Sequence, residues 1–159
     1  MCWRADSLDP ASASSLRREI AAHLERNSDG SSDLSGAAVI VGELLANAAR
    51  YAPGPVCVAL DWRASEPTFV IQDTGPGFEP PAELPPHLAE GGRGLYIVSW
   101  LANRLVAERA QGGGMRICVT LPVKREEGDE PARPSCPMER PFTRGAMCEW
   151  PLRRRVEIA

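Results

Sequence analysis

The chain has 159 residues, enough for one domain with a proper core, and its hydrophobic content of 43% and charged content of 25% are ordinary for a globular protein. The net charge of −3 gives no general attraction to nucleic acid or an anionic membrane, and no apolar run approaches the roughly 20 residues of a membrane helix. The start has no signal-peptide core, and the five cysteines show no CxxC spacing. We therefore expect a cytoplasmic protein with reduced thiols and with no direct nucleic-acid or membrane partner.

Apolar periodicity and turn residues predict the elements. Leu16, Ile20 and Leu24 recur at helical spacing, and Asp33 is the expected N-cap of a second helix. Alternating β-branched stretches indicate strands, and the proline-rich stretch after them is too long for a tight turn. In chain order we predict a strand over 2–5, helices over 11–26 and 34–51, strands over 56–62 and 68–73, a covering loop over 79–92, a helix over 93–105, and strands over 106–110 and 115–123.

The order of these elements predicts the fold class. Strands joined by short hairpins must be antiparallel, and helices with one apolar stripe each should cover one face of the sheet. We predict an α+β fold, a two-layer α/β sandwich with a mostly antiparallel mixed sheet covered on one face by helices. This domain spans residues 1–123, and the proline-rich, charged stretch 124–159 is predicted to be a disordered or loosely packed tail.

The first candidate motif, Glu43-Leu-Leu-Ala-Asn47, lies inside the second predicted helix. The spacing of four places the carboxylate and the amide on one helical face. The amide oxygen suits a hard cation such as Mg²⁺, and the carboxylate suits a general base. An exposed polar stripe would explain the same pattern, so the motif alone leaves both interpretations open.

The second motif, Asp73-Thr-Gly75-Pro-Gly77, follows the apolar strand that contains Phe69 and Ile71. A carboxylate at a strand end can accept a hydrogen bond from an exocyclic amine such as that of adenine, and glycines allow backbone to approach a ligand closely. A type II turn with a solvated aspartate fits these five residues equally well.

The third motif, Gly91-Gly92-Arg93-Gly94-Leu95, opens the third predicted helix behind the proline-rich loop. Backbone N–H groups at a helix start attract phosphate. Taken alone, the motif is also compatible with a flexible junction between a loop and a helix.

The order and spacing of the three motifs, over residues 2–123, resemble those of the Bergerat-fold (GHKL) ATPase superfamily, which includes the histidine kinases. The stretches "VGELLANAARYAPGPVCVAL", "VIQDTGPGF" and "GGRGLYIV" are most similar to the anti-sigma-factor serine/threonine kinases. The resemblance implies an ATP-binding domain that uses ATP and Mg²⁺.

The resemblance also implies residue roles. Glu43 would be the catalytic base, and Asn47 would bind the Mg²⁺ that bridges the phosphates. Asp73 would bind the adenine amino group. The remaining residues expected to bind the cofactor are Gly75 and Gly77 in the adenine pocket and Gly92, Arg93, Gly94 and Leu95 at the phosphates, with Arg50 and Tyr51 at the pocket mouth.

Two departures from the kinase pattern leave the activity open. The kinases of this branch carry an arginine just before the glycine box, whereas this chain reads Ala89-Glu90-Gly91, and Met115 stands where a threonine is usual. The first hypothesis is Mg-ATP-dependent phosphorylation of an anti-anti-sigma-type partner, together with sequestration of a sigma factor. The alternative is a nucleotide-gated protein-binding module with little or no kinase activity.

Two further options concern the first helix. A histidine-kinase fragment would need a phosphoacceptor on a dimerising hairpin, and His23 lies in a helix that has no second helix to form one. A homodimer is also left open, because the first helix and the edge strand near residues 2–4 would offer a surface.

Overall fold

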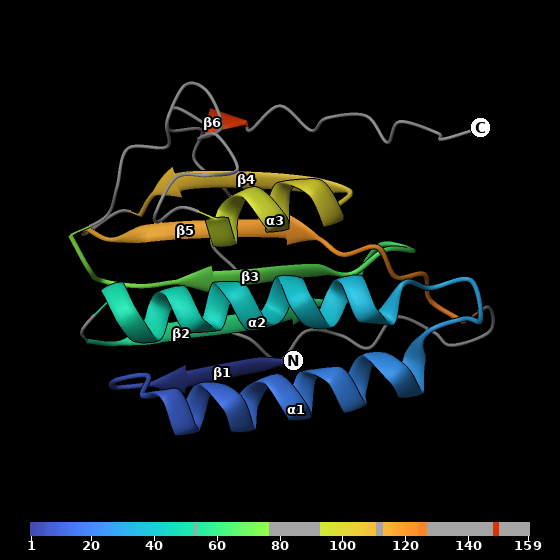
Figure 1. Ribbon diagram of the computed structural model, residues 1–159, viewed down its shortest axis with the longest axis horizontal. Helices are drawn as coiled ribbons and strands as arrows, with labels where there is room; N and C mark the ends of the chain where they lie inside the picture. Colours follow the sequence, from blue (N-terminus) through green and yellow to red (C-terminus); the bar gives the residue numbers. More distant parts are fainter. Residues whose placement is uncertain (53, 77–92, 111–112, 127–147, 150–159) are drawn as a thin grey trace.

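The computed structural model describes residues 1–52, 54–76, 93–110, 113–126 and 148–149 (Figure 1). In chain order the elements are β1 (Cys2–Ala5), α1 (Pro10–Asn27), α2 (Leu34–Tyr51), β2 (Val56–Asp61), β3 (Thr68–Gln72), α3 (Arg93–Leu101), β4 (Arg104–Arg109), β5 (Met115–Thr120) and β6 (Cys148–Glu149). All the predicted helices and strands in these ranges are present, and β6 is an addition that the sequence did not indicate.

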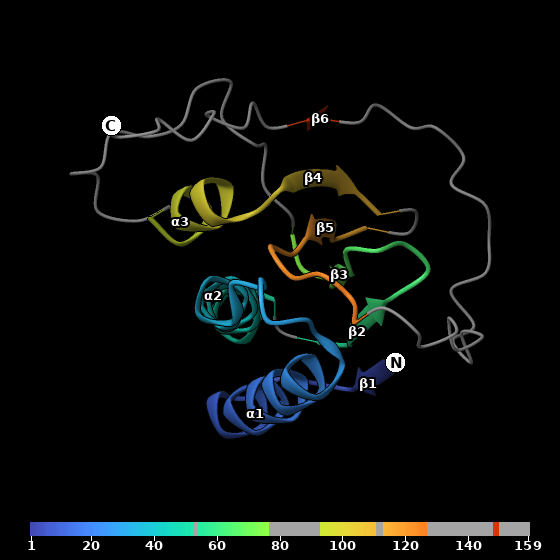
Figure 2. The ribbon, with the colours of Figure 1, turned by 90° about the vertical axis from the view of Figure 1, so that its right-hand side faces the viewer.

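The strands form one sheet in the order β1-β2-β3-β5-β4-β6, and each neighbouring pair is antiparallel. The helices α1, α2 and α3 all lie on the same face of this sheet, as the side view in Figure 2 shows. The predicted α+β two-layer fold is therefore confirmed. The described strands contain no parallel pair, so the sheet is more uniformly antiparallel than expected.

Side-chain caps fix where the two long helices begin. The Asp9 carboxylate accepts a bond of 2.7 Å from the Ser12 N–H, and Pro10 occupies the first helical position of α1, where its missing N–H is not needed. The Asp33 carboxylate accepts a bond of 2.8 Å from the Gly36 N–H and caps α2 in the same way. The predicted N-cap of the second helix is thus confirmed.

The core lies between the helices and the sheet. The stripe predicted on the first helix faces it, since Ile20 and Leu24 are buried and Leu16 is half-buried against them. Side chains from both layers with at most 1% exposure include Ile20, Leu24, Ile40, Leu44, Leu60, Phe69, Leu105 and Val119. Burying one such side chain contributes about 1.5–3 kcal/mol, so this seam holds the helices in place.

The third helix is shorter than predicted, because it ends at Leu101 and not at Leu105. After its last turn, the Asn103 N–H donates to the Thr120 carbonyl at 3.0 Å, which turns the chain onto the neighbouring strand. Leu105 is buried in β4 opposite Val119. Its apolar side chain fits a helical stripe and an alternating strand equally well, and the pairing with β5 decides between them.

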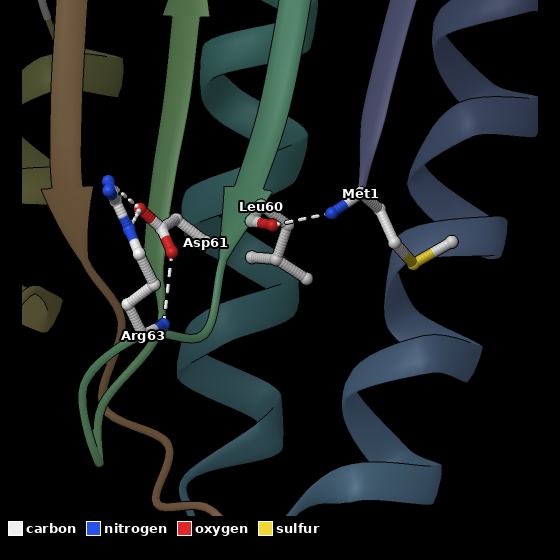
Figure 3. Close-up of polar contacts among 4 residues, drawn as sticks. All are labelled: Met1, Leu60, Asp61 and Arg63. Atoms are coloured by element: carbon white, nitrogen blue, oxygen red, sulfur yellow. Dashed lines mark hydrogen bonds and ion pairs between the residues drawn. The ribbon is translucent and has the colours of Figure 1, made fainter. Parts of the chain in front are cut away.

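The first residue extends the pairing of β1 with β2, and a charged pair lies at the end of β2 (Figure 3). The Met1 amino group donates to the Leu60 carbonyl at 2.8 Å, and the Leu60 N–H donates back to Met1 at 2.9 Å. The Asp61 carboxylate accepts bonds from the Arg63 backbone N–H at 3.0 Å and from Arg63 Nε at 2.7 Å. Asp61 therefore closes the turn that leads into β3.

Ordered contacts continue a short way past the predicted domain end. The Asp29 N–H donates to the Lys124 carbonyl at 2.9 Å, and the Glu126 N–H donates to the Asn27 carbonyl at 3.2 Å. These bonds tie the chain after β5 to the loop between α1 and α2. Apart from β6, the stretch after Glu126 that is predicted to be a tail lies outside the described residues.

The cysteines differ from the expectation of uniformly reduced thiols. Cys57 and Cys118 are free and half-buried, but Cys2 is disulfide-bonded, so the expectation is wrong for this residue. Burial raises the pKa of the Cys118 thiol. Among the described residues, no helix is both long enough and apolar enough to cross a membrane.

Asp61 should make stability depend on acid pH. Partial burial would raise the pKa of Asp61, but the hydrogen bonds and charge of Arg63 outweigh burial and hold it below its ordinary value of 3.8. A carboxylate with a lowered folded-state pKa stabilises the fold above its ordinary pKa, and this stabilisation is lost as pH falls through the folded-state value. We expect Asp61→Asn to cost up to about 1 kcal/mol at neutral pH and to flatten the acid limb of urea-unfolding free energy against pH. Exposed Glu25→Gln is the control, and an unchanged acid limb in Asp61→Asn would contradict the assignment.

Candidate functional site

Glu43 and Asn47 lie on one face of α2, as their spacing predicts. Both side chains are half-buried. Of the three residues between them, Leu44 and Leu45 are buried in the core and Ala46 is exposed. The carboxylate and the amide thus lie at the boundary between core and solvent. That position argues against an exposed polar stripe and fits groups that face a shielded site.

The start of α3 lies directly against these two side chains. A Cβ added to Gly94 would come within 2.7 Å of Glu43 Oε2 and 3.2 Å of Asn47 Nδ2. Figure 1 shows α3 beside α2 on the same face of the sheet. The first and third motifs, far apart in sequence, therefore meet where Glu43, Asn47 and Gly94 lie close together.

Asp73 follows β3 and is held by the neighbouring strand. Its Oδ1 accepts bonds from the Gly75 N–H at 2.9 Å and the Met115 N–H at 3.2 Å, and its own N–H donates to the Met115 carbonyl at 3.0 Å. Within the described part of the chain, no donor bonds to Oδ2. The carboxylate is half-buried, so it is oriented by the fold and is not a freely solvated turn residue.

Two glycines bring backbone segments close together around Asp73. A Cβ on Gly75 would lie 3.1 Å from Ala52 Cα, so the chain after β3 packs on the end of α2. Gly114 has a φ of +84°, and a Cβ there would collide with the Asp73 carbonyl oxygen. Ala52 follows Asn47 by five residues, roughly 7.5 Å along a helix axis, so α2 links the Asp73 side of the site to the Glu43 side.

The other predicted site residues have less defined positions. Arg93 is exposed at the first position of α3, and Leu95 is half-buried and packs against the core. Gly77 and Gly92 lie outside the described residues, as does the predicted covering loop with the Ala89-Glu90-Gly91 stretch.

Arg50 and Tyr51, expected at the pocket mouth, are exposed in the last turn of α2. The Arg50 guanidinium carbon lies 5.8 Å from the centre of the Tyr51 ring, within the range of a cation–π contact. The pair therefore extends the Glu43 and Asn47 face of α2 toward its C-terminal end.

Sequence reasoning missed how Met115 and Gly114 support the site. Met115 is 1% exposed and pairs with Asp73 through its backbone in both directions. The only sequence signal was the run of three glycines before Met115, which indicates a tight hairpin but not what the hairpin contacts.

His23 is half-buried and engaged by neighbouring side chains. Its ring meets the Trp62 ring edge-on, with centroids 6.3 Å apart, and the Asn27 amide lies 3.4 Å from His23 Nδ1. Burial lowers the pKa of His23, and the nearby amino terminus and Arg26 lower it further. A half-buried histidine on a helix packed against α2 is a poor candidate for a phosphoacceptor, because its ring is already held by Trp62 and Asn27.

The site residues suit a hard cation that is shared with phosphate. Glu43 and Asn47 supply oxygen ligands, which Mg²⁺ prefers. Two side chains cannot complete an octahedral shell, so Mg²⁺ here would also need phosphate oxygens and waters. Gly94 brings the backbone at the start of α3 beside these two groups, so a phosphate bound at the helix start would lie near them.

Helices on one face of an antiparallel sheet, with the described parts of the three motifs close to α2, are consistent with an ATP-binding domain of the GHKL type. The family model described as "Histidine kinase-like ATPase domain" matches residues 7–121, and the chain belongs to this family. The match runs from the turn before α1 to the residue after β5. No curated protein matches the chain.

A pair of adjacent glycines can test how tightly the β4–β5 hairpin holds Asp73. Gly113 and Gly114 both have positive φ, but a Cβ on Gly113 meets nothing within 4 Å, whereas one on Gly114 meets the Asp73 backbone. We expect Gly113→Ala to cost about 1–2 kcal/mol from backbone conformation alone. Gly114→Ala should cost about 1–3 kcal/mol more, because Asp73 must move. Urea unfolding measures both, and equal losses would show that the contact with Asp73 is not tight.

Proposed function

We propose that the protein is a Mg-ATP-dependent serine/threonine kinase that phosphorylates an anti-anti-sigma-type protein and sequesters a sigma factor. The contact of Gly94 with Glu43 and Asn47 carries this proposal, because it brings a helix start beside a carboxylate and an amide. The family assignment supports the ATP-binding part. The resemblance of "VGELLANAARYAPGPVCVAL" and "GGRGLYIV" to anti-sigma-factor kinases supports the choice of partners.

Glu43 would perform the acid–base step. Its half-buried carboxylate takes the proton from the acceptor's serine or threonine hydroxyl as that oxygen forms a bond to the γ-phosphorus of ATP. The bond from the γ-phosphorus to the oxygen bridging the β- and γ-phosphates breaks, and ADP leaves with that electron pair. Because Gly94 has no side chain, the Glu43 carboxylate can lie beside the start of α3, where the phosphate end is expected.

Asn47 and the start of α3 would hold the phosphate end. The Asn47 amide oxygen would be a ligand of Mg²⁺, and the bound ion would neutralise charge that develops on the phosphates. The N–H groups at the start of a helix point along its axis and favour an anion there, and α3 begins at Arg93. Gly94 lets that backbone approach without a side chain in the way.

Asp73 would read the adenine. Its Oδ1 is held by Gly75 and Met115, while Oδ2 has no donor from the described residues and can accept from an exocyclic amine. The bonds to Oδ1 orient the carboxylate before the nucleotide arrives, so less side-chain entropy is lost when Oδ2 binds the adenine.

A second candidate function is the nucleotide-gated binding module with little or no phosphoryl transfer. Met115 favours it, since a buried thioether beside Asp73 supplies no hydroxyl where the kinases have one. The sequence before the glycine box, which has no arginine at residues 89–91, also favours the nucleotide-gated module. One arginine can contribute several kcal/mol to the stabilisation of a phosphoryl-transfer transition state. Arg93, exposed at the start of α3, is a cation inside the glycine box itself.

Calorimetry of ATP binding tests the pocket. We expect Asp73→Asn to weaken ATP binding about ten- to hundredfold both with and without Mg²⁺, since a hydrogen bond to a charged group is lost. Asn47→Ala is the matched variant and should weaken binding only when Mg²⁺ is present. Wild-type affinity in Asp73→Asn would refute the adenine assignment.

Transfer from γ-labelled ATP tests the enzyme. The protein is incubated with candidate anti-anti-sigma-type acceptors, and we expect label on a serine or threonine at a rate that Glu43→Gln lowers by about 10²- to 10⁴-fold, the usual contribution of a general base. ATP binding by Glu43→Gln is the control. Intact ATP binding with no label transfer by the wild type would favour the nucleotide-gated module instead.

A further inference from the structure

A groove runs between α1 and α2, on the side of α2 that faces α1. Its volume is about 380 Å³. The two helices lie side by side in both ribbon views (Figures 1 and 2). The residues that line it are Pro10, Ala13, Ser14, Arg17, Gly42, Leu45, Ala46, Ala49 and Arg50.

One wall of the groove is built around an arginine. A Cβ on Gly42 would lie 3.2 Å from both Cζ and Nε of Arg17, so the guanidinium group lies close to the backbone of α2 at Gly42. Glycine inside a helix costs about 1 kcal/mol relative to alanine. Glycine at position 42 thus lowers the stability of α2, but its missing side chain lets Arg17 of α1 reach the backbone of α2.

The groove is positively charged. Arg17 lies beside Gly42, where the lining stretch of α2 begins, and Arg50 lies where that stretch ends; both are exposed, and none of the lining residues is acidic. This differs from the chain as a whole, whose net charge is −3. The chemistry that complements such a groove is an acidic segment with small apolar side chains between its carboxylates.

The groove also borders the proposed catalytic residue. Successive helix residues are about 100° apart around the axis, which places exposed Ala46 roughly 60° from Glu43. Arg50 lies between these two directions, one helical turn further on. A protein segment seated in the groove therefore lies alongside the carboxylate that would accept the hydroxyl proton.

We infer that the α1–α2 groove binds an acidic segment of the protein that accepts the phosphoryl group, with Arg17 as the main cationic contact. This inference rests on the proposed function for the identity of the partner. The groove determines which proteins can present a hydroxyl to Glu43, while the nucleotide pocket is left to the other face of α2.

NMR with the ¹⁵N-labelled full chain tests the inference. The probes are a short peptide of Glu, Leu and Ala and a counterpart with Lys in place of Glu. We expect only the acidic peptide to shift the amides of Ala13–Arg17 and Gly42–Arg50. Arg17→Glu should weaken its binding about three- to tenfold, since an exposed attractive pair becomes repulsive, and higher salt should weaken it further. Ala46→Glu, which introduces charge and bulk without touching Arg17, should have the same effect.

Arg18→Glu is the matched control, because Arg18 is exposed on α1 but does not line the groove. Equal shifts with the two peptides, or equal losses in Arg17→Glu and Arg18→Glu, would overturn the inference. So would Arg17-dependent dimerisation in sedimentation analysis, which would assign the groove to a second copy of the chain. The groove inference and the proposed kinase function can fail separately, because peptide binding needs no phosphoryl transfer. Calorimetry of ATP binding to Arg17→Glu shows whether the nucleotide pocket is intact when the groove is altered.

Discussion

The arrangement of the site depends on one contact, between the backbone of Gly94 and the side chains of Glu43 and Asn47. A helix start is rich in unpaired N–H groups, and half-buried carboxylate and amide groups need polar partners. A side chain at position 94 would displace the Glu43 carboxylate from its present position, because its Cβ would lie 2.7 Å from Glu43 Oε2. Glycine at this position therefore keeps the helix start, the carboxylate and the amide beside one another, and phosphate is a ligand that helix starts bind.

A second set of contacts fixes the position of Asp73 relative to Glu43 and Asn47. Asp73 is bonded to Met115 across the β3–β5 pair, and Gly75 rests on Ala52 at the end of α2. The sheet is held to α2 by side chains such as Leu44 and Phe69, each at most 1% exposed. Since α2 carries Glu43 and Asn47 and also supports Gly75, one rigid helix fixes the separation of the two ends.

Features that depend on local signals could be predicted from the sequence. Asp33 caps α2 through its own side chain, and the spacing of Glu43 and Asn47 needs only helical periodicity. Features that depend on distant pairing could not. Leu105 fits a helix or a strand until β5 is beside it, and Met115 bonds to Asp73 over 42 residues. The fold class could therefore be predicted from local signals, whereas the bonds that hold Asp73 depend on long-range pairing and could not.

The circumference of α2 divides into three surfaces because only part of it is needed for stability. Leu44 and Leu45 are buried at 1% exposure each, and two such side chains contribute roughly 3–6 kcal/mol of burial. That is more than the cost of about 1 kcal/mol for an interior glycine at position 42. The remaining surface can then hold the polar groups Glu43 and Asn47 toward α3 and small residues toward α1. Because Glu43 and Ala46 share one helical turn, a shift of α2 on either side moves both surfaces together.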